Sequence, residues 1–353
     1  MNRSNSHHMD NQNELQKEIT DQTPLPDDTN PNKLTVKSLH IIPTTLSLLL
    51  MALLVGVAIF TVRHVQDENS IVSTIKPITI GTHFDQFLGL SLQAKAVYVY
   101  DVNDRKILFA KNEEAQLPLA SLTKVMTALV IAESVPESTI VTIPQSSVEK
   151  DKKSGVASGI QGGDRLKLHD LIGYTLSVSS NGGAGIIAAL GSGIQLKDNG
   201  SSTTTPFLEQ MNTVAKELSL HQTYFLNETG LDISETKAGA YGSAKDVATL
   251  FEYILIRHPS IVEPTSYKDA SVGTINNNLR KAVNTNAIIS ETPRVLASKT
   301  GLTPLAGGNL AMVVDAGLAH PIIIVVLGST EQGRFDDVKK LIKTATETLN
   351  LKP

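Results

Sequence analysis

The stretch Leu117-Pro-Leu-Ala-Ser-Leu-Thr-Lys-Val-Met-Thr-Ala-Leu-Val-Ile-Ala-Glu-Ser134 begins like a loop and continues like a buried helix. Ser121 and Lys124 lie three residues apart, so their side chains share one face of the first helical turn. A serine that caps the helix and a lysine that reaches solvent would explain the pair structurally. A chemical explanation is that a neutral lysine removes the serine proton and so makes a nucleophile. Burial beside a second cation would lower the lysine pKa far enough for this.

A second polar stretch, Ser177-Val-Ser-Ser-Asn-Gly-Gly-Ala-Gly185, interrupts two apolar segments. A loop that ends in a helix N-cap would account for these residues. The functional interpretation places Ser179 and Asn181 at the mouth of a cleft. There Ser179 would pass a proton and Asn181 would hold a substrate amide.

A third stretch, Ala297-Ser-Lys-Thr-Gly-Leu-Thr303, reads as an edge strand that ends in a turn. Its functional interpretation makes Lys299 the second cation beside the serine. Thr300 would then face a substrate carboxylate, and Gly301 would let another chain approach the strand edge closely.

Strand patterns at both ends of the folded part enclose a mainly helical middle. Residues 94–101 and 106–110 predict one hairpin, residues 309–315 and 321–328 predict a second, and 334–349 predict an amphipathic closing helix. We therefore expect an α+β fold, in which an antiparallel sheet from both ends of the domain packs against a helical lobe.

Composition excludes several classes of function. The 353 residues carry a net charge of −4, which gives no reason to expect a nucleic-acid partner. Cysteine is absent, so disulfides, thiolate catalysis and Cys-ligated zinc are excluded. We expect no cofactor and no metal.

Four segments are predicted along the chain. Residues 1–40 are polar and read as a disordered tail, and 41–63 form an apolar run long enough for one transmembrane helix. Residues 64–92 read as a stalk, and 93–353 as a single catalytic domain.

An uncleaved membrane anchor is favoured over a cleaved signal peptide. The apolar run is too long for the hydrophobic region of a signal peptide, the tail before it is unusually long, and no Ala-x-Ala site follows it. Lys33 and Lys37 precede the run while Arg63 follows it, which weakly favours a cytoplasmic N-terminus. The expected location is the cytoplasmic membrane, with a single span and an extracytoplasmic catalytic domain.

The order S-x-x-K, S-x-N, K-T-G is the set found in penicillin-binding proteins and class A β-lactamases. From about residue 92 to 347 the chain resembles the D-alanyl-D-alanine carboxypeptidases (peptidase S11, low-molecular-weight penicillin-binding proteins). The resemblance implies a β-lactamase/transpeptidase-like fold. The segments that carry it are residues 95–101, 118–128, 207–218, 225–232, 241–246, 284–286 and 299–308.

The resemblance also implies roles for individual residues. Ser121 would be the acylated nucleophile and Lys124 its general base. Ser179, Asn181 and Lys299 would shuttle protons and position the substrate, a peptidoglycan stem peptide. Thr300 would bind the terminal carboxylate, while the backbone N–H groups of Ser121 and Leu302 would form the oxyanion hole. β-Lactams would be covalent inhibitors.

Three departures from the family pattern stand out. The usual S-[GS]-N-D-A lacks its acid, because Gly182 follows Asn181. We interpret that acid as a support of the loop, so its loss would affect the rate more than the reaction. The usual N-P-T-G-L reads Asn227-Glu-Thr-Gly-Leu231. Finally, the chain ends just after the predicted last helix, where many members continue into a second domain and a C-terminal amphipathic anchor. The N-terminal span would replace that anchor.

Three alternatives to the carboxypeptidase remain. A D,D-endopeptidase that cuts peptidoglycan cross-links is the nearest one. A β-lactamase would need a glutamate for rapid hydrolysis of the acyl-enzyme, and Glu228 only superficially imitates that position. A non-enzymatic binding module is supported by the missing acid alone, and the intact Ser121, Lys124 and Lys299 argue against it.

Overall fold

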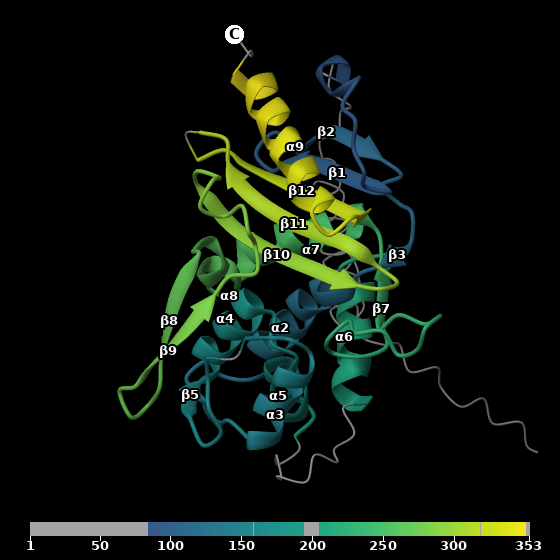
Figure 1. Ribbon diagram of the computed structural model, residues 1–353. Coiled ribbons are helices and arrows are strands. Elements are labelled where there is room, and N and C mark those ends of the chain that lie inside the picture. Colours follow the sequence, from purple (N-terminus) through teal and green to yellow (C-terminus); the bar gives the residue numbers. More distant parts are fainter. Residues whose placement is uncertain (1–83, 158, 194–204, 318, 351–353) are drawn as a thin grey trace, which may run out of the picture. The chain divides into compact units, whose positions relative to one another are not determined.

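The computed structural model describes residues 84–157, 159–193, 205–317 and 319–350. Its main sheet has five antiparallel strands in the order β10-β11-β12-β1-β2. The strands are β1 (Ala96–Asp101), β2 (Lys106–Lys111), β10 (Val295–Thr303), β11 (Gly307–Asp315) and β12 (Pro321–Ser329). The last strand of the sequence pairs with the first, so the two ends of the domain build one sheet (Figure 1), which confirms the prediction.

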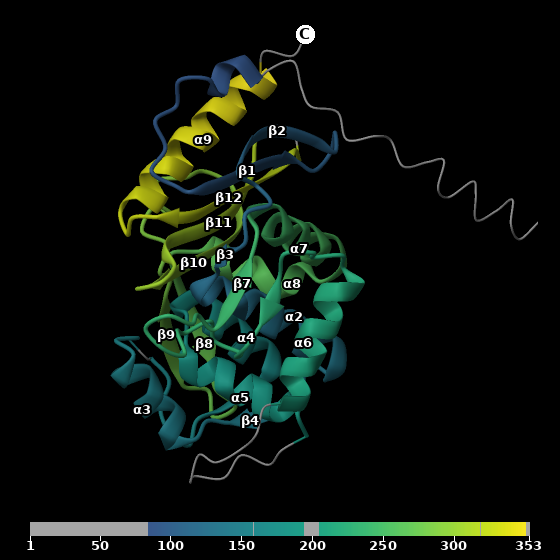
Figure 2. The same cartoon turned by 90° about the vertical axis from the view of Figure 1, so that its right-hand side faces the viewer.

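Successive side chains of a strand point to opposite sides of the sheet. Strands β1, β11 and β12 are apolar along most of their length, so both faces of the sheet are apolar. In β1, Val97 and Val99 belong to the core under the C-terminal helix α9 (Gly333–Asn350). Tyr98 and Tyr100 belong to the larger core on the helical side. Figure 2 shows α9 on one face of the sheet and the helical lobe on the other. The closing helix predicted from its apolar spacing is thus confirmed.

The helical lobe lies between β2 and β10 in the sequence. Its α-helices are α2 (Thr123–Ser134), α3 (Gln145–Lys153), α4 (Leu168–Val178), α5 (Asn181–Gly191), α6 (Thr205–Glu217), α7 (Ala244–Arg257) and α8 (Pro259–Val262). The described residues also form three short 3₁₀ helices, η1 (Phe84–Phe87), η2 (Ala120–Leu122) and η3 (Glu263–Ser266). The remaining strands are β3 (Leu117–Pro118), β4 (Ile140–Thr142), β5 (Arg165–Lys167), β6 (Tyr224–Phe225), β7 (Ala240–Gly242), β8 (Asp269–Gly273) and β9 (Leu279–Val283).

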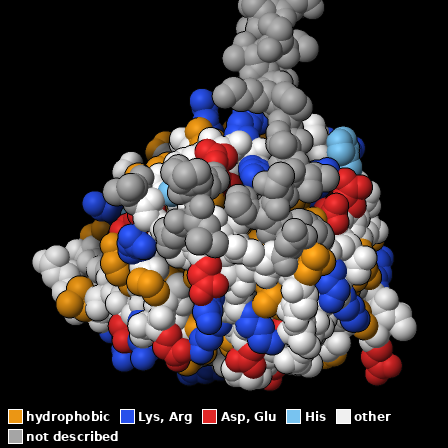
Figure 3. All heavy atoms as spheres, turned by 90° about the horizontal axis from the view of Figure 1, so that it is seen from above, with side chains coloured by type: hydrophobic (Ala, Val, Ile, Leu, Met, Phe, Trp, Pro, Cys, Tyr) orange, Lys and Arg blue, Asp and Glu red, His pale blue; other side chains and the backbone are white. Residues whose placement is uncertain are grey.

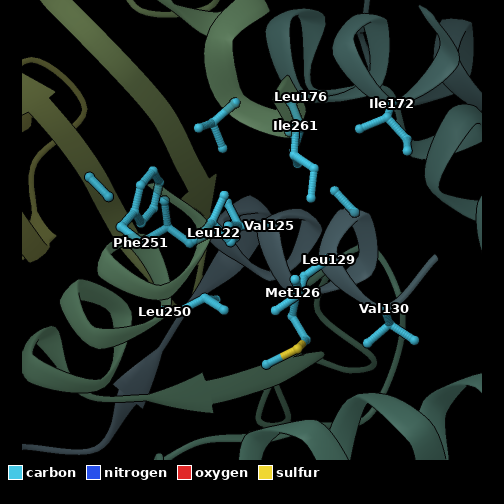
Figure 4. Packing of buried hydrophobic residues seen from close by; sticks show 14 of the residues in the cluster. Leu122, Val125, Met126, Leu129, Val130, Ile172, Leu176, Leu250, Phe251 and Ile261 are labelled. Atoms are coloured by element: carbon cyan, nitrogen blue, oxygen red, sulfur yellow. The ribbon is translucent and has the colours of Figure 1, made fainter. Parts of the chain in front are cut away.

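Helix α2 is the centre of this lobe. Every residue from Thr123 to Ile131 is buried, because other helices surround α2. Figure 4 shows its apolar side chains among those of α4, α7 and α8. A helix that is apolar nearly all round is stable only in such a place. The motif that contains Ser121 and Lys124 therefore sits at the start of a helix that is enclosed by the rest of the lobe.

The folded domain begins earlier than the sequence predicted. Phe87 is buried, and its ring stacks on Phe109 of β2 with the centroids 5.1 Å apart. Leu90 and Leu92 pack against the same core under α9. The limit between stalk and domain at residue 92 is therefore wrong, because these apolar side chains cover one face of the sheet.

The predicted tail, the predicted span at 41–63 and most of the predicted stalk lie outside the described residues. Within the described ranges, none of the helices combines the length and the apolar character that a membrane crossing requires. On the face of the domain seen in Figure 3, acidic and basic side chains are interspersed.

Candidate active site

Ser121 and Lys124 are in direct contact. The Lys124 Nζ donates to the Ser121 Oγ at 3.0 Å and to the carbonyl oxygen of Thr229 at 2.8 Å. Ser121 lies in the 3₁₀ turn η2, and α2 has no side-chain cap. The capping explanation of this serine is therefore wrong, and its hydroxyl is bonded to the lysine instead.

The backbone around the serine is strained and tightly supported. Ala120 has a φ of 48°, a left-handed conformation that costs a non-glycine residue about 1–2 kcal/mol. Gly230 lies against it, and a Cβ at residue 230 would collide with the Ala120 carbonyl oxygen. The Asn227 Oδ1 accepts the N–H groups of Thr229 and Gly230 at 3.1 and 2.7 Å. This bonding holds the loop whose Thr229 carbonyl receives Lys124.

Ser179 and Asn181 lie at the sharp corner between α4 and α5. Ser179 is left-handed, with φ 61° and ψ 40°. Ser180 caps α5, since its Oγ accepts the Gly183 N–H at 2.7 Å. Asn181 is only 4% exposed, and its Oδ1 has no hydrogen-bond partner among the described residues. That oxygen therefore has an unused acceptor position in a buried place, and the substrate contact expected of Asn181 stays a prediction.

Lys299 forms a second serine–lysine contact. It lies on the edge strand β10, and its Nζ donates to the Ser179 Oγ and to the Thr300 carbonyl oxygen, both at 2.9 Å. Gly301 brings β10 against the turn before Ser121, because a Cβ at residue 301 would lie 3.0 Å from the Leu119 carbonyl oxygen. The close approach predicted at Gly301 is thus made by Leu119 of the same chain.

The end of β10 is more open. The Leu302 side chain is 42% exposed. The Thr300 Oγ1 shares a 2.6 Å hydrogen bond with the Thr285 Oγ1, and the Thr285 N–H donates to the Ser177 carbonyl oxygen at 3.0 Å. Thr285 therefore links β10 to the end of α4. The sequence contained Thr285 within a segment typical of the family but assigned it no role.

Burial acts on both lysines. Burial lowers the pKa of Lys124 to about 7. The negative charges of Glu228 and Asp151 act against this by raising the pKa, and the positive charge of Lys150 lowers it further. The pKa of Lys299 is held well below its usual value by burial, and then by the positive charges of Lys124 and Arg334. The sequence predicted that Lys299 would lower the pKa of Lys124, but the charges that act on Lys124 are those of Glu228, Asp151 and Lys150, without Lys299. The structure adds that burial is the first cause for each, and that Lys299 is under pressure to lose its own charge.

The sequence did not indicate two charged residues that adjoin the site. Arg334 of α9 is buried, and its Nη1 donates to the Gly301 carbonyl oxygen at 2.7 Å. Asp151 of α3 is buried under the corner that carries Asn181. Neither residue has a local pattern that marks it, since each acts across a long sequence separation. In the part of the chain that the structure describes, no three His, Asp or Glu side chains are grouped to hold a metal ion.

Two buried lysine amines, each bonded to a serine hydroxyl, have the geometry of a serine acyl-transfer site in which an amine activates the nucleophile. Comparison with known proteins agrees with this class. A family model described as D-alanyl-D-alanine carboxypeptidase matches residues 83–331. The chain belongs to this family, the S11 peptidases.

Individual relatives are similar over most of the chain. DacF of Bacillus subtilis, a D-alanyl-D-alanine carboxypeptidase, is 29% identical over 72% of this chain and 63% of its own length. The chain thus spans less than two thirds of that relative. A D-alanyl-D-alanine endopeptidase of Pseudomonas aeruginosa is 27% identical over 72% of this chain and 78% of its own length.

The fold has close counterparts among solved structures. Penicillin-binding protein D2 of Listeria monocytogenes, in its cefotaxime-bound form, superposes with a TM-score of 0.59 and 25% identity, over 72% of this chain and 98% of that one. The predicted transpeptidase-like α+β fold is therefore confirmed for the folded domain.

Proposed function

We propose that the protein is a serine-type D,D-carboxypeptidase that removes the terminal D-Ala from peptidoglycan stem peptides. The observation that carries this proposal is the 3.0 Å contact between the Ser121 Oγ and the buried Lys124 Nζ, in a chain of the S11 family. The second pair, Lys299 with Ser179, supports the same reaction.

The proposed chemistry has two halves. Neutral Lys124 takes the Ser121 proton, and the Oγ attacks the carbonyl carbon of the penultimate D-Ala. The backbone N–H groups of Ser121 and Leu302 stabilise the oxyanion. The C–N bond then breaks, the departing amine takes a proton by way of Ser179 and Lys299, and D-Ala leaves. Water hydrolyses the resulting ester and restores the Ser121 hydroxyl.

Substrate binding is proposed for the residues that remain. Asn181 presents its free Oδ1 to the substrate amide. Thr300 binds the terminal carboxylate, with Lys299 supplying positive charge near it. Gly301 keeps β10 close to the Ser121 turn. β-Lactams would acylate the same serine.

The D,D-endopeptidase is the second candidate. The specific observation in its favour is that the Pseudomonas endopeptidase is matched over 78% of its length, more than the Bacillus carboxypeptidase at 63%. Both reactions use the same acyl-enzyme and differ in the amine that leaves.

The purified protein should release free D-Ala from a stem pentapeptide that ends in D-Ala-D-Ala. The same peptide ending in D-Ala-L-Ala should give no product, because the inverted Cα would turn the terminal carboxylate away from Thr300. Free alanine is measured enzymatically with each stereoisomer. Cleavage of a cross-linked muropeptide dimer without release from the pentapeptide would replace this proposal by the endopeptidase.

We also propose that residues 41–63 anchor the protein in the cytoplasmic membrane with the catalytic domain outside. This proposal rests on the uncharged run from Ile41 to Val62 and on Lys33 and Lys37 before it. Residues 1–40 would be a cytoplasmic tail and the segment after 63 a stalk.

Protease added to intact spheroplasts should digest the catalytic domain, since no bilayer would protect it. Immunoblots with an antibody against the domain follow its loss, and a cytosolic protein serves as the control for intact membranes. Protection of the domain until detergent is added would show the inverted topology. Release of a shortened chain into the medium would favour the signal peptide.

A further inference from the structure

The Asp151 carboxylate lies beneath the corner between α4 and α5. Asp151 is 1% exposed although it carries an ionisable side chain. Its Oδ2 accepts the Ser180 hydroxyl at 2.5 Å, and its Oδ1 accepts the Gly182 N–H at 2.8 Å. The two oxygens therefore bind the residues on either side of Asn181.

Residue 182 has no room for an acid of its own. A Cβ at Gly182 would overlap the carbonyl oxygen of Ser147 in α3. The backbone of α3 fills the space where a side chain of residue 182 would lie. The same helix supplies a carboxylate from Asp151, so the acid missing from the sequence motif is present in space.

The corner held by this carboxylate bears two proposed site residues. Ser179 has a left-handed backbone, and its Oγ accepts a hydrogen bond from the Lys299 Nζ. Asn181 has a buried Oδ1 that makes no hydrogen bond among the described residues. A strained turn keeps such a conformation only when its surroundings determine it. On the basis of the proposed function, we propose that Asp151 is a positioning residue for acylation, which holds Ser179 and Asn181 in the geometry that the substrate meets.

Asp151 also influences the general base by its charge. Its carboxylate and that of Glu228 raise the pKa of Lys124 against burial, while Lys150 lowers it. On the side of β10 the titratable neighbour is Lys299, whose own pKa burial and the charge of Lys124 hold low. Removal of the Asp151 charge should therefore leave Lys124 unprotonated at a lower pH. A purely structural support would have no such effect.

The test compares Asp151→Asn with the wild-type protein. An amide of the same shape can still accept the Gly182 N–H through its oxygen, but its NH₂ group must donate to the Ser180 Oγ instead of accepting from it, and the negative charge is lost. Acylation by a labelled penicillin should slow by about tenfold to a hundredfold, the range expected for a misplaced reacting group. The acid limb of the pH profile, where the acylation rate rises as Lys124 loses its proton, should move to lower pH, because the Asp151 charge no longer raises the pKa of Lys124.

Asp337→Asn is the matched control. The Asp337 carboxylate is equally buried and accepts the backbone N–H groups of Gln93 and Ala94 and the Ser329 hydroxyl. This variant should lose thermal stability but keep the wild-type acylation rate and pH limb. A wild-type acylation rate in Asp151→Asn would overturn the positioning role, and so would an equal slowing in Asp337→Asn.

Ser180→Ala covers the case in which Asp151→Asn does not fold. It removes one hydrogen bond to Asp151 and keeps the charge, so acylation should slow while the pH limb stays in place. A wild-type rate in Ser180→Ala would contradict the proposal. If the wild-type protein itself is never labelled, the proposed function fails, and the role of Asp151 fails with it.

Discussion

Replacing Ser121 by alanine should abolish covalent labelling of the protein by penicillin. Ser121 is the hydroxyl bonded to the buried Lys124 amine, and alanine leaves no atom to attack the β-lactam carbonyl. Loss of a nucleophile reduces turnover by a factor of order 10⁶, far below detection of an adduct. Intact-protein mass spectrometry measures the added mass, and peptide mapping of the wild-type adduct locates it.

The fold should survive this change. Ser121 is half-buried and loses one hydrogen bond, which costs about 1 kcal/mol, so the thermal transition should shift little. An adduct that maps to any residue other than Ser121 would refute the assignment of the nucleophile. The lifetime of the wild-type adduct tests a second point, since rapid release of hydrolysed penicillin would identify a β-lactamase.

Lys124→Arg should lose acylation almost entirely, by about 10²–10⁴-fold, the usual contribution of a general base. A guanidinium cannot give up its proton at any pH used in such an assay. Lys299→Arg keeps a positive charge near Thr300 and should retain measurable acylation, with weaker binding of the D-Ala carboxylate. Stopped-flow acylation rates and substrate KM values separate the two effects.

A second variant at the same position tests whether Lys124→Arg loses acylation only because the larger side chain disturbs packing. Lys124 is fully buried, so Lys124→Met, with a neutral chain of similar length, should fold and yet also fail to acylate. In the wild-type protein the rate should rise with pH through about 7, since burial lowers the pKa of Lys124 to about 7 and only its neutral form accepts a proton. If Lys299→Arg proves more damaging than Lys124→Arg, the two lysines exchange roles.

The structure also gives a physical reason why Lys299→Arg could lose more acylation than Lys124→Arg. Burial and the charge of Lys124 both hold the pKa of Lys299 low, and Arg334 adds to this. Two amines that share an enclosed site cannot both keep a charge near neutral pH. The pair of arginine substitutions decides which amine is neutral, because each removes the possibility of deprotonation at one position.

Periodicity in the sequence was sufficient for the main architecture. Continuous runs of apolar, largely β-branched residues predicted the hairpin that became β11 and β12, and helical spacing predicted α9. These signals are local, since a short apolar run between turn residues fits a strand that is buried on both faces, and a helix repeats its buried face about every 3.6 residues. The S-x-x-K spacing likewise predicted the contact of Ser121 with Lys124, because one helical turn sets it.

The limit of the domain was less well predicted. Residues 86–92 show no clear period, yet Phe87 and Leu90 pack on the sheet against side chains that come from distant parts of the chain. Such isolated apolar residues resemble a linker until their partners are known.

The sequence by itself determined the order of the elements, the three motifs and the residue types available for acyl transfer. Only the tertiary structure decided which groups surround them. The Thr229 carbonyl that receives Lys124 lies 105 residues away, and the Asp151 carboxylate that binds Ser180 lies 29 residues away. Chain folding brings such groups together by close packing of separate helices and strands, which no short pattern encodes. For the same reason burial, which sets the pKa of Lys124 and Lys299, is a property of the assembled core.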